Sequence, residues 1–266
     1  MTKSLVEQQF GAHASAYATS AVHAKGASLG RLVELVQPER HWQMLDVATG
    51  AGHTAAAFAP HVARVVASDL TEEMLQETAK LAAAKGFANL ETARADAEAL
   101  PYPDACFELV TCRIAAHHFP DIATFVAEVW RVLKPGGVFA LVDNISPDAE
   151  STPGFSSAEL RDASLTYNAF EKIRDPSHGR CFGMVEWSEL FADTGFEVLA
   201  KERSPKEIEF APWAERMGCD AATIERLRSM LTGASLALAA FLKPRQDGGK
   251  LWFVLDEAIV VGRKPS

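Results

Sequence analysis

The sequence predicts an α/β fold built on a doubly wound, mostly parallel sheet. Short apolar runs alternate with segments of helical periodicity from residue 44 to about residue 142. The first apolar run, residues 44–48, leads into the glycine turn Gly50-Ala51-Gly52 and then into a helix. Two further apolar runs near the end, 196–200 and 251–261, are separated by a helical stretch. Strands that alternate with helices indicate parallel crossovers, so helices should cover both faces of the sheet.

The elements of the alternating region follow in order. Strands are predicted at residues 44–48, 62–68, 90–95, 107–112 and 138–142. Helices are predicted at 4–37, 53–58, 71–85 and 122–133. Thr54, Thr71 and Asp121 are candidate N-cap residues, because their side chains can accept a hydrogen bond from the first helical turn. Gly86 is expected to end the third of these helices.

Beyond residue 144 the pattern is looser. Helices are expected at 155–174, 186–194 and within 211–242, and the two late strands should form an antiparallel pair at one edge. No stretch has the composition of a linker. We therefore expect one domain over residues 1–266, with N-terminal helices at 1–40, a core at 41–145, and further helices and the last strands at 146–266.

Composition limits the partners that the chain can have. Its 266 residues carry a formal net charge of -9, which disfavours nucleic acid and anionic membranes as partners. The four cysteines are scattered and indicate neither a disulfide framework nor a zinc site. The N-terminal residues lack a signal-peptide pattern, and no apolar run approaches the roughly 20 residues of a membrane span. A cytoplasmic protein is expected.

The glycine turn and two acidic residues point to a ligand. The turn alone fits both a plain structural turn and a dinucleotide fingerprint. Asp46 precedes the turn by four residues, and we expect its carboxylate to face the ligand, where it would repel a pyrophosphate and attract a sulfonium or ammonium group. Asp69, about 20 residues further on, is placed to accept hydrogen bonds from ribose hydroxyls. A ribose beside a cationic group favours S-adenosyl-L-methionine over NAD.

Six motifs in register give the chain a family resemblance. They are Asp46-x-x-x-Gly50-x-Gly52, Asp69, Asp96-Ala97, Leu100-Pro101-Tyr102-Pro103-Asp104-x-x-Phe107, His117-His118-Phe119-Pro120-Asp121 and Arg131-Val132-Leu133-Lys134-Pro135-Gly136-Gly137. In this order they resemble the class I S-adenosylmethionine-dependent methyltransferases, most nearly the UbiE-like group of ubiquinone and menaquinone biosynthesis. The resemblance covers about residues 10–145. It implies a seven-stranded sheet with the last strand antiparallel, a cofactor-binding core, and helical lid additions before and after it.

The resemblance also implies which residues bind S-adenosyl-L-methionine. The expected contacts are Tyr17, Asp46, Thr49, Gly50, Gly52, Asp69, Leu70, Met74, Asp96, Ala97 and Arg113. Asp69 would bind both ribose hydroxyls, and Asp96 would accept from the adenine amino group. Tyr17 would lie on a lid helix over the cofactor.

The acceptor side is less specific in the sequence. His117 and His118 follow the fourth strand, and either is a candidate base, although a purely structural histidine pair is the alternative. Neighbouring side chains usually point apart, so only one should face the cleft. Asn144 and His178, the latter in the polar loop 174–182, are candidate substrate contacts. The apolar residues of 155–170 favour a small hydrophobic or aromatic acceptor, methylated on oxygen or carbon.

Other functions remain open at this point. Asp143-Asn144 ends the fifth strand, where catechol-type methyltransferases hold Mg²⁺, but Arg113 occupies the position of a further ligand and would repel the ion, so no metal is expected. An S-adenosylmethionine-binding protein that performs an isomerisation or cyclisation is one alternative, and a dinucleotide-dependent oxidoreductase is another. The sequence leaves open whether the chain forms a homodimer.

Overall fold

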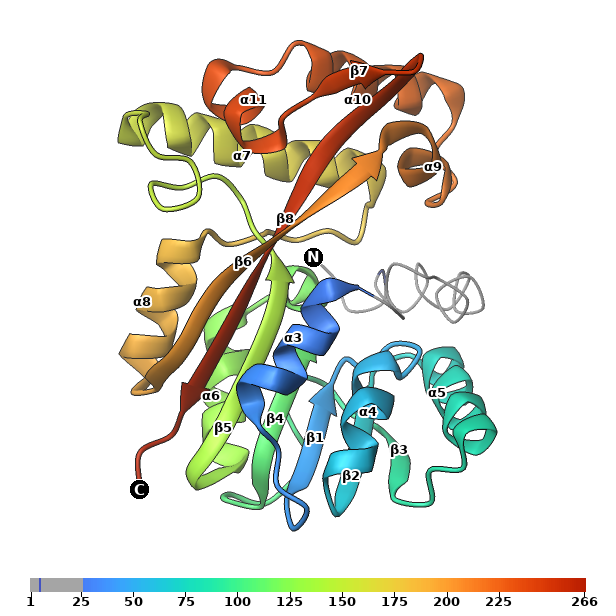
Figure 1. Cartoon of the computed structure of the whole chain (residues 1–266), viewed down its shortest axis with the longest axis vertical. Coiled ribbons are helices and arrows are strands. Elements are labelled where there is room, and N and C mark those ends of the chain that lie inside the picture. The colour runs from blue at the N-terminus through green and yellow to red at the C-terminus, as the bar shows by residue number, and fades with distance from the viewer. Residues whose placement is uncertain (1–4, 6–25) are drawn as a thin grey trace. The chain divides into compact units, whose positions relative to one another are not determined.

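The computed structural model describes residue 5 and residues 26–266 (Figure 1). The chain separates into two compact units. The first unit comprises Met1–Asp143, Glu189–Glu202 and Ile259–Ser266, and the second comprises Asn144–Ser188 and Arg203–Ala258. The single domain expected over residues 1–266 stays a prediction, because this division does not show whether either unit folds alone.

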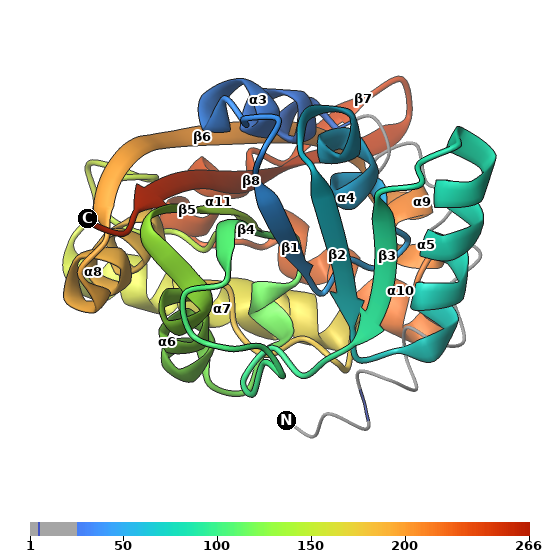
Figure 2. The same ribbon diagram turned by 90° about the horizontal axis from the view of Figure 1, so that it is seen from below.

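The first unit contains a parallel sheet. Its strands are β1 (Gln43–Val47), β2 (Arg64–Asp69), β3 (Leu90–Arg94), β4 (Phe107–Arg113) and β5 (Leu133–Asn144), and they pair in the order β3–β2–β1–β4–β5. Beyond β5 the sheet continues to β8 (Lys250–Arg263) and then β6 (Glu197–Glu209), with the last strands antiparallel (Figure 2). The predicted fold class is confirmed. The short β7 (Arg245–Asp247), which pairs antiparallel with β8, was not predicted.

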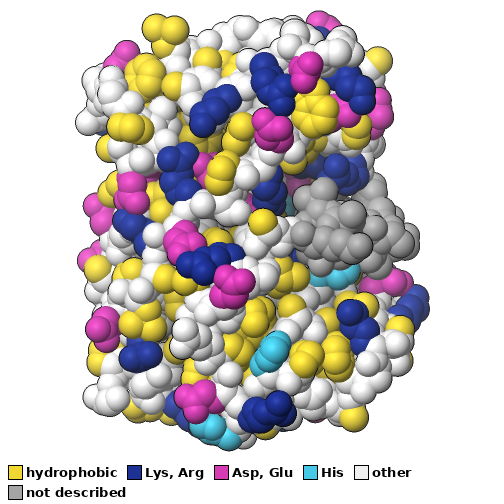
Figure 3. All heavy atoms as spheres, in the orientation of Figure 1, with side chains coloured by type: hydrophobic (Ala, Val, Ile, Leu, Met, Phe, Trp, Pro, Cys, Tyr) yellow, Lys and Arg dark blue, Asp and Glu magenta, His cyan; other side chains and the backbone are white. Residues whose placement is uncertain are grey.

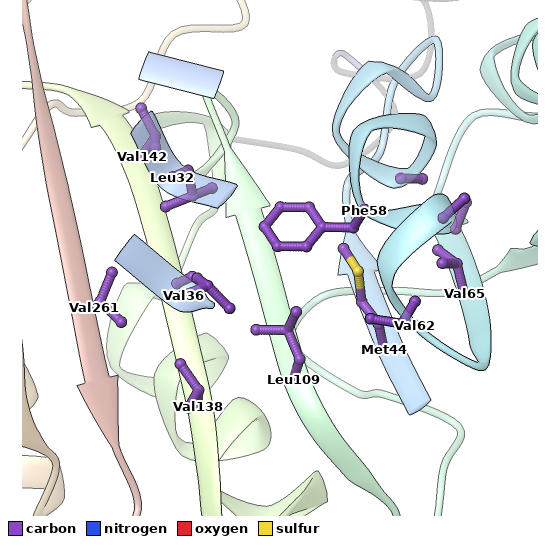
Figure 4. Close-up of a cluster of buried hydrophobic side chains, with 14 of the residues drawn as sticks. Leu32, Val36, Met44, Phe58, Val62, Val65, Leu109, Val138, Val142 and Val261 are labelled. Atoms are coloured by element: carbon purple, nitrogen blue, oxygen red, sulfur yellow. The ribbon is translucent and has the colours of Figure 1, made fainter. Parts of the chain in front are cut away.

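Helices cover both faces of the sheet in the first unit. They are α3 (Ala27–Val36), α4 (His53–Phe58), α5 (Glu72–Lys85), α6 (Ile122–Val132) and the end of α8 (Met184–Thr194), with short 3-10 helices η1 (Ala59–His61) and η2 (Ala116–His118). On one face, Leu32 of α3 and Phe58 of α4 pack in a buried cluster with Leu109 and Val138 (Figure 4). Phe139 points to the opposite face and contacts Phe125 of α6.

The local signals in the sequence explain most helix boundaries. Asp121 caps α6 by accepting a hydrogen bond from the Thr124 backbone N–H at 3.1 Å. Gly86 ends α5 in the left-handed region at φ +70°. Thr54 is not the N-cap of α4, which was a wrong prediction: the helix begins after Gly52, and Thr54 lies within its first turn.

The second unit contains four helices among the described residues. They are α7 (Ser157–Arg174), α9 (Phe210–Glu215), α10 (Ala221–Thr232) and α11 (Leu236–Leu242). A capping box at Ser156 and Glu159 begins α7. Trp213 of α9 stacks on Phe170 of α7 and meets Phe253 of β8 edge-on. These aromatic contacts form the core of the second unit.

Strand β6 is much longer than the five residues predicted for it. Its second half, residues 203–209, is mostly polar and contains Pro205, so it carries no apolar signal. Ion pairs with β7 and β8 explain why it still forms a strand: Arg203–Asp256, Lys206–Glu257, Glu207–Arg245 and Glu209–Lys250. A strand that is held by cross-strand charges lacks the apolar alternation on which the prediction depended.

The surface agrees with the mixed composition. The face of the molecule in Figure 3 carries Lys and Arg side chains interspersed with Asp and Glu. Among the described residues, no helix is both long and apolar enough to cross a lipid bilayer.

Candidate active site

A cavity opens at the carboxyl edge of the parallel sheet in the first unit. It encloses about 1030 Å³, including the space at its mouth, which suits a small molecule. Its walls come from the segments that follow β1, β2, β3 and β4: residues 48–51, 53–54, 69–71, 74, 95–98, 113–115 and 118–120. This is where open α/β sheets usually bind ligands.

The cavity brings together most of the residues that the sequence predicted for the cofactor. Those that line it are Thr49, Gly50, Asp69, Leu70, Met74, Asp96, Ala97 and Arg113. His118 also lines it, whereas Asp46, Gly52 and His117 do not. Tyr17 lies outside the described residues.

Two residues of the cavity wall have a strained backbone. Ala48, just after β1, has φ +51°, and Ile114, just after β4, has φ +56°. A residue with a Cβ pays about 1–2 kcal/mol in this left-handed region, and the cost is largest for a β-branched side chain such as isoleucine. Strain of this kind is concentrated at functional sites. The two central strands therefore end in conformations that favour a binding role over stability.

Substitution of Ala48 by glycine is expected to raise the free energy of unfolding by about 0.5–1 kcal/mol, because glycine adopts positive φ without strain. Ala83→Gly is the matched control: Ala83 is exposed within α5, where the same change should lower the free energy of unfolding by about 0.5–1 kcal/mol. Urea denaturation of Ala48→Gly and Ala83→Gly measures whether each change raises or lowers the free energy of unfolding. A destabilised Ala48→Gly would show that the strain at this turn is not significant.

The carboxylate of Asp69 links two segments of the cavity wall, the glycine turn after β1 and the segment after β2. Its Oδ2 accepts a hydrogen bond from the Gly50 backbone N–H at 2.9 Å, and its Oδ1 accepts one from the Thr71 N–H at 2.9 Å. Burial raises the pKa of Asp69, while these backbone N–H groups oppose the rise. Each carboxylate oxygen has a second lone pair, so Asp69 can also accept two hydroxyl groups of a ligand.

Gly50 and Gly52 differ in what they contribute. A Cβ on Gly50 would meet nothing within 4 Å, although its φ of +56° favours glycine. At Gly52 the φ is +83°, and a Cβ would lie 2.7 Å from Cγ2 of Thr78. Thr78 in turn donates from Oγ1 to the Gly50 carbonyl at 2.8 Å. Gly52 therefore allows α5 to approach the turn and does not itself line the cavity.

Asp46 does not face the cavity, contrary to the expectation from the sequence. It is 1 % exposed, and its carboxylate accepts hydrogen bonds from Oγ1 of Thr49 and of Thr111, both at 2.6 Å, and from the Ala55 N–H at 3.1 Å. The Ala55 N–H belongs to the first turn of α4, which has no side-chain cap of its own. The Asp46 carboxylate therefore caps α4 through the Ala55 N–H, and it fixes the start of the glycine turn through Thr49.

Burial raises the pKa of Asp46 to about 6, with the hydrogen bonds from Thr111 and Thr49 partly opposing the rise. Between about pH 4 and about pH 6 the folded protein then binds this proton more tightly than the unfolded chain, so the free energy of unfolding should decrease as pH rises. Asp46→Asn removes this contribution, which is on the order of 3 kcal/mol. Urea denaturation of the wild-type protein and of Asp46→Asn, at pH values below about 4 and above about 6, tests this contribution. If the free energy of unfolding depended on pH in the same way in both proteins, the raised pKa of Asp46 would be contradicted.

Arg113 and Asp96 lie on different walls of the cavity. Arg113 donates from Nε to Oγ1 of Thr54 at 2.9 Å, which links the end of β4 to the first turn of α4. Asp96 accepts from the Glu98 N–H at 3.0 Å, which shapes the loop after β3. The cavity therefore has a basic group beside the glycine turn and an acidic loop after β3.

The two neighbouring histidines differ in their surroundings. His118 lines the cavity together with the apolar residues Ile114, Ala115, Phe119 and Pro120, whereas His117 does not line it. His117 is buried, and its Nδ1 lies 2.6 Å from Oδ1 of Asp143 at the end of β5. The ring centroids of the two histidines are 4.1 Å apart.

The two predicted substrate contacts belong to the second unit. His178 is 2 % exposed, and its Nε2 lies 3.0 Å from Oδ1 of Asn168 on α7. Asn144 is half-buried at the end of β5. Neither lines the cavity of the first unit, so their role in binding an acceptor stays a prediction.

Among the described residues, no group of three or more His, Cys, Asp or Glu side chains has an arrangement that could hold a metal ion. Asp143, at the position where catechol-type methyltransferases hold Mg²⁺, contacts the backbone and ring of His117.

Several cavity residues were not predicted. They include Ala48, His53, Thr71, Glu98, Ile114 and Phe119. The available signal was position, because each lies within about six residues after the end of a parallel strand. Residue type gave no signal, because the six residues include apolar, polar and charged side chains.

The comparisons with known proteins agree with this geometry. A family model described as a methyltransferase domain matches residues 45–141. The uncharacterized methyltransferase YcgJ of Bacillus subtilis is 33% identical over 262 residues, which cover 97% of this chain and 98% of that protein. Its crystal structure superposes with a TM-score of 0.79 at 32% identity, over 90% of this chain and 98% of that one. This chain belongs to the methyltransferase family.

The resemblance to the UbiE-like group is also confirmed. The demethylmenaquinone methyltransferase of Deinococcus radiodurans is 41% identical over 104 residues, which cover 38% of this chain and 42% of that protein. The enzyme class is therefore that of the S-adenosylmethionine-dependent methyltransferases.

Proposed function

We propose that this protein transfers the methyl group of S-adenosyl-L-methionine to an oxygen or carbon of a small hydrophobic or aromatic acceptor. One observation carries the proposal. A single cavity is lined by the acidic Asp69, the apolar Leu70 and Met74, and His118. When bound, the cofactor supplies an already activated methyl group, so the chain needs no nucleophile of its own.

The residues of the cavity fit this cofactor. Asp69 has lone pairs for two ribose hydroxyls, and Leu70 and Met74 offer an apolar surface to the adenine ring. The Asp96 carboxylate suits the adenine amino group as a hydrogen-bond acceptor. Arg113, beside the glycine turn, suits the carboxylate of the methionine end.

His118 is the base in this proposal. It lines the cavity, and the imidazole of a neutral histidine can accept a proton from the acceptor. Alignment of the acceptor with the methyl group contributes up to ~7–11 kcal/mol, so the cavity wall matters as much as the base.

The apolar residues around His118 support the choice of acceptor. Ile114, Ala115, Phe119 and Pro120 form the wall next to the ring. By contrast, the apolar residues of 155–170 that suggested a hydrophobic acceptor are largely used elsewhere, since Tyr167 and Phe170 are buried in the second unit. The likeness to demethylmenaquinone methyltransferases makes aromatic quinols the first acceptors to test.

The test has a binding step and a turnover step. Calorimetry should show that S-adenosylhomocysteine binds and that NAD does not. A panel of quinols, phenols and enols with methyl-labelled cofactor should then show label transfer to an acceptor. Tight NAD binding without S-adenosylhomocysteine binding would overturn the proposal. Conversion of a substrate without label transfer would favour the isomerisation or cyclisation alternative.

The cytoplasmic location and the oligomeric state stay predictions.

A further inference from the structure

Asp143 directs both of its carboxylate oxygens at one residue. Oδ2 accepts a hydrogen bond from the His117 backbone N–H at 2.8 Å, and Oδ1 lies 2.6 Å from His117 Nδ1. Asp143 has no exposed surface, and the His117 side chain is 8 % exposed. Removing a carboxylate from water is costly, and these contacts to His117 offset part of that cost.

The contact with Asp143 determines where His117 carries its proton. A carboxylate accepts hydrogen bonds and cannot donate one, so Nδ1 of His117 must be the protonated nitrogen. The lone pair of the neutral ring then lies on Nε2. Free histidine prefers the other arrangement, with the proton on Nε2. Asp143 therefore imposes the less common tautomer on His117.

His117 in turn supports His118. The two rings lie against each other, with centroids 4.1 Å apart and planes inclined by 46°. Both residues belong to η2, a single 3-10 turn with no side-chain cap. The bond from Asp143 to the His117 backbone anchors this turn beside the cavity.

We propose that Asp143 is a positioning residue: it acts through His117 and holds His118 in a fixed orientation at the cavity. This inference rests on the proposed function, because only a base at the acceptor gains from a fixed ring. It adds a buried carboxylate at the end of β5 to a site otherwise built from the segments after β1, β2, β3 and β4.

Nitrogen-15 NMR of histidine-labelled protein tests the proposal without an acceptor. In the wild-type protein we expect the neutral His117 ring to be protonated on Nδ1. In Asp143→Asn, the amide oxygen should take the backbone N–H and the amide NH₂ should face Nδ1. The proton of His117 should therefore move to Nε2, and the ring signals of His118 should shift. Affinity for S-adenosylhomocysteine should stay unchanged, because Asp143 does not line the cavity.

His117→Asn is the matched variant. Its amide NH₂ takes the place of Nδ1–H and keeps the bond to Asp143, but the ring beside His118 is lost, so the His118 signals should shift here too. A wild-type His117 protonated on Nε2 would overturn the inference, and this measurement needs no variant to fold. Unchanged His118 signals in both variants would overturn it as well. Failure of the wild-type protein to bind S-adenosylhomocysteine would instead contradict the proposed function, whatever the tautomer.

Discussion

Replacement of His118 by alanine is expected to lower kcat by about 10²–10⁴-fold, the usual contribution of a general base. Affinity for S-adenosylhomocysteine should change little, because the contacts proposed for the cofactor lie on Arg113 and on the segments after β1, β2 and β3, and do not include His118. The rate of the wild-type enzyme should also fall as pH decreases through the pKa of the acting histidine, since only the neutral ring accepts a proton. Steady-state kinetics with an acceptor from the panel measures these effects.

His41→Ala is the control for this experiment. The His41 side chain is 70% exposed and lies outside the cavity, so the variant should keep the wild-type kcat. An unchanged kcat in His118→Ala would leave alignment of the substrates as the whole mechanism. The histidine pair would then have only a structural role.

Replacement of Asp69 by alanine is expected to weaken S-adenosylhomocysteine binding by about 1.5–3 kcal/mol, or about 10–150-fold. This variant loses two sets of hydrogen bonds, and both losses weaken binding. The ribose hydroxyls lose their acceptor, and the N–H groups of Gly50 and Thr71 lose the bonds that hold the two walls. Isothermal titration calorimetry measures the affinity, and thermal unfolding shows whether the fold is retained.

Asp69→Asn separates the two losses. The asparagine oxygen can keep one of the two backbone bonds, so binding should fall by less than in the alanine variant. Asp104→Ala is the control, because its side chain is 79% exposed and lies outside the cavity. Wild-type affinity in Asp69→Ala would rule out this carboxylate as the ribose contact.

Most residues that the sequence predicted for the cofactor lie together in one cavity for a physical reason. Asp69, Asp96 and Arg113 each stand at or just beyond the carboxyl end of a parallel strand, and all such ends meet at one edge of the sheet. Identification of the strands was therefore enough to bring these residues together. The strand order β3–β2–β1–β4, which was not predicted, decides which of these residues are neighbours.

Identification of the strands did not reveal which way the Asp46 carboxylate points. It lies inside β1, and its orientation depends on Thr111 of β4 and on the uncapped first turn of α4. Thr111 becomes a neighbour of Asp46 only after β4 has paired with β1. The same limit applied to His117, whose partner Asp143 is distant in the sequence.

The acceptor side was harder to predict because its signals are ambiguous. The apolar residues of α7 have the same periodicity whether they line a binding site or a core, and Tyr167 and Phe170 proved to be core residues of the second unit. The polar loop at His178 contacts α7 through Asn168. The polarity of this loop therefore did not reveal whether its residues contact a ligand or bond to another part of the protein.

All cavity-lining residues in the described part of the chain fall within one continuous stretch, from Ala48 to Pro120. A mutation elsewhere in the gene therefore changes none of these residues and acts on them only indirectly, as Asp143 does through His117. Recombination between relatives can replace segments after β5 without changing the identity of any described lining residue. The same arrangement makes the protein a suitable host for exchanging residues 144–188 or 203–258 between relatives in the laboratory.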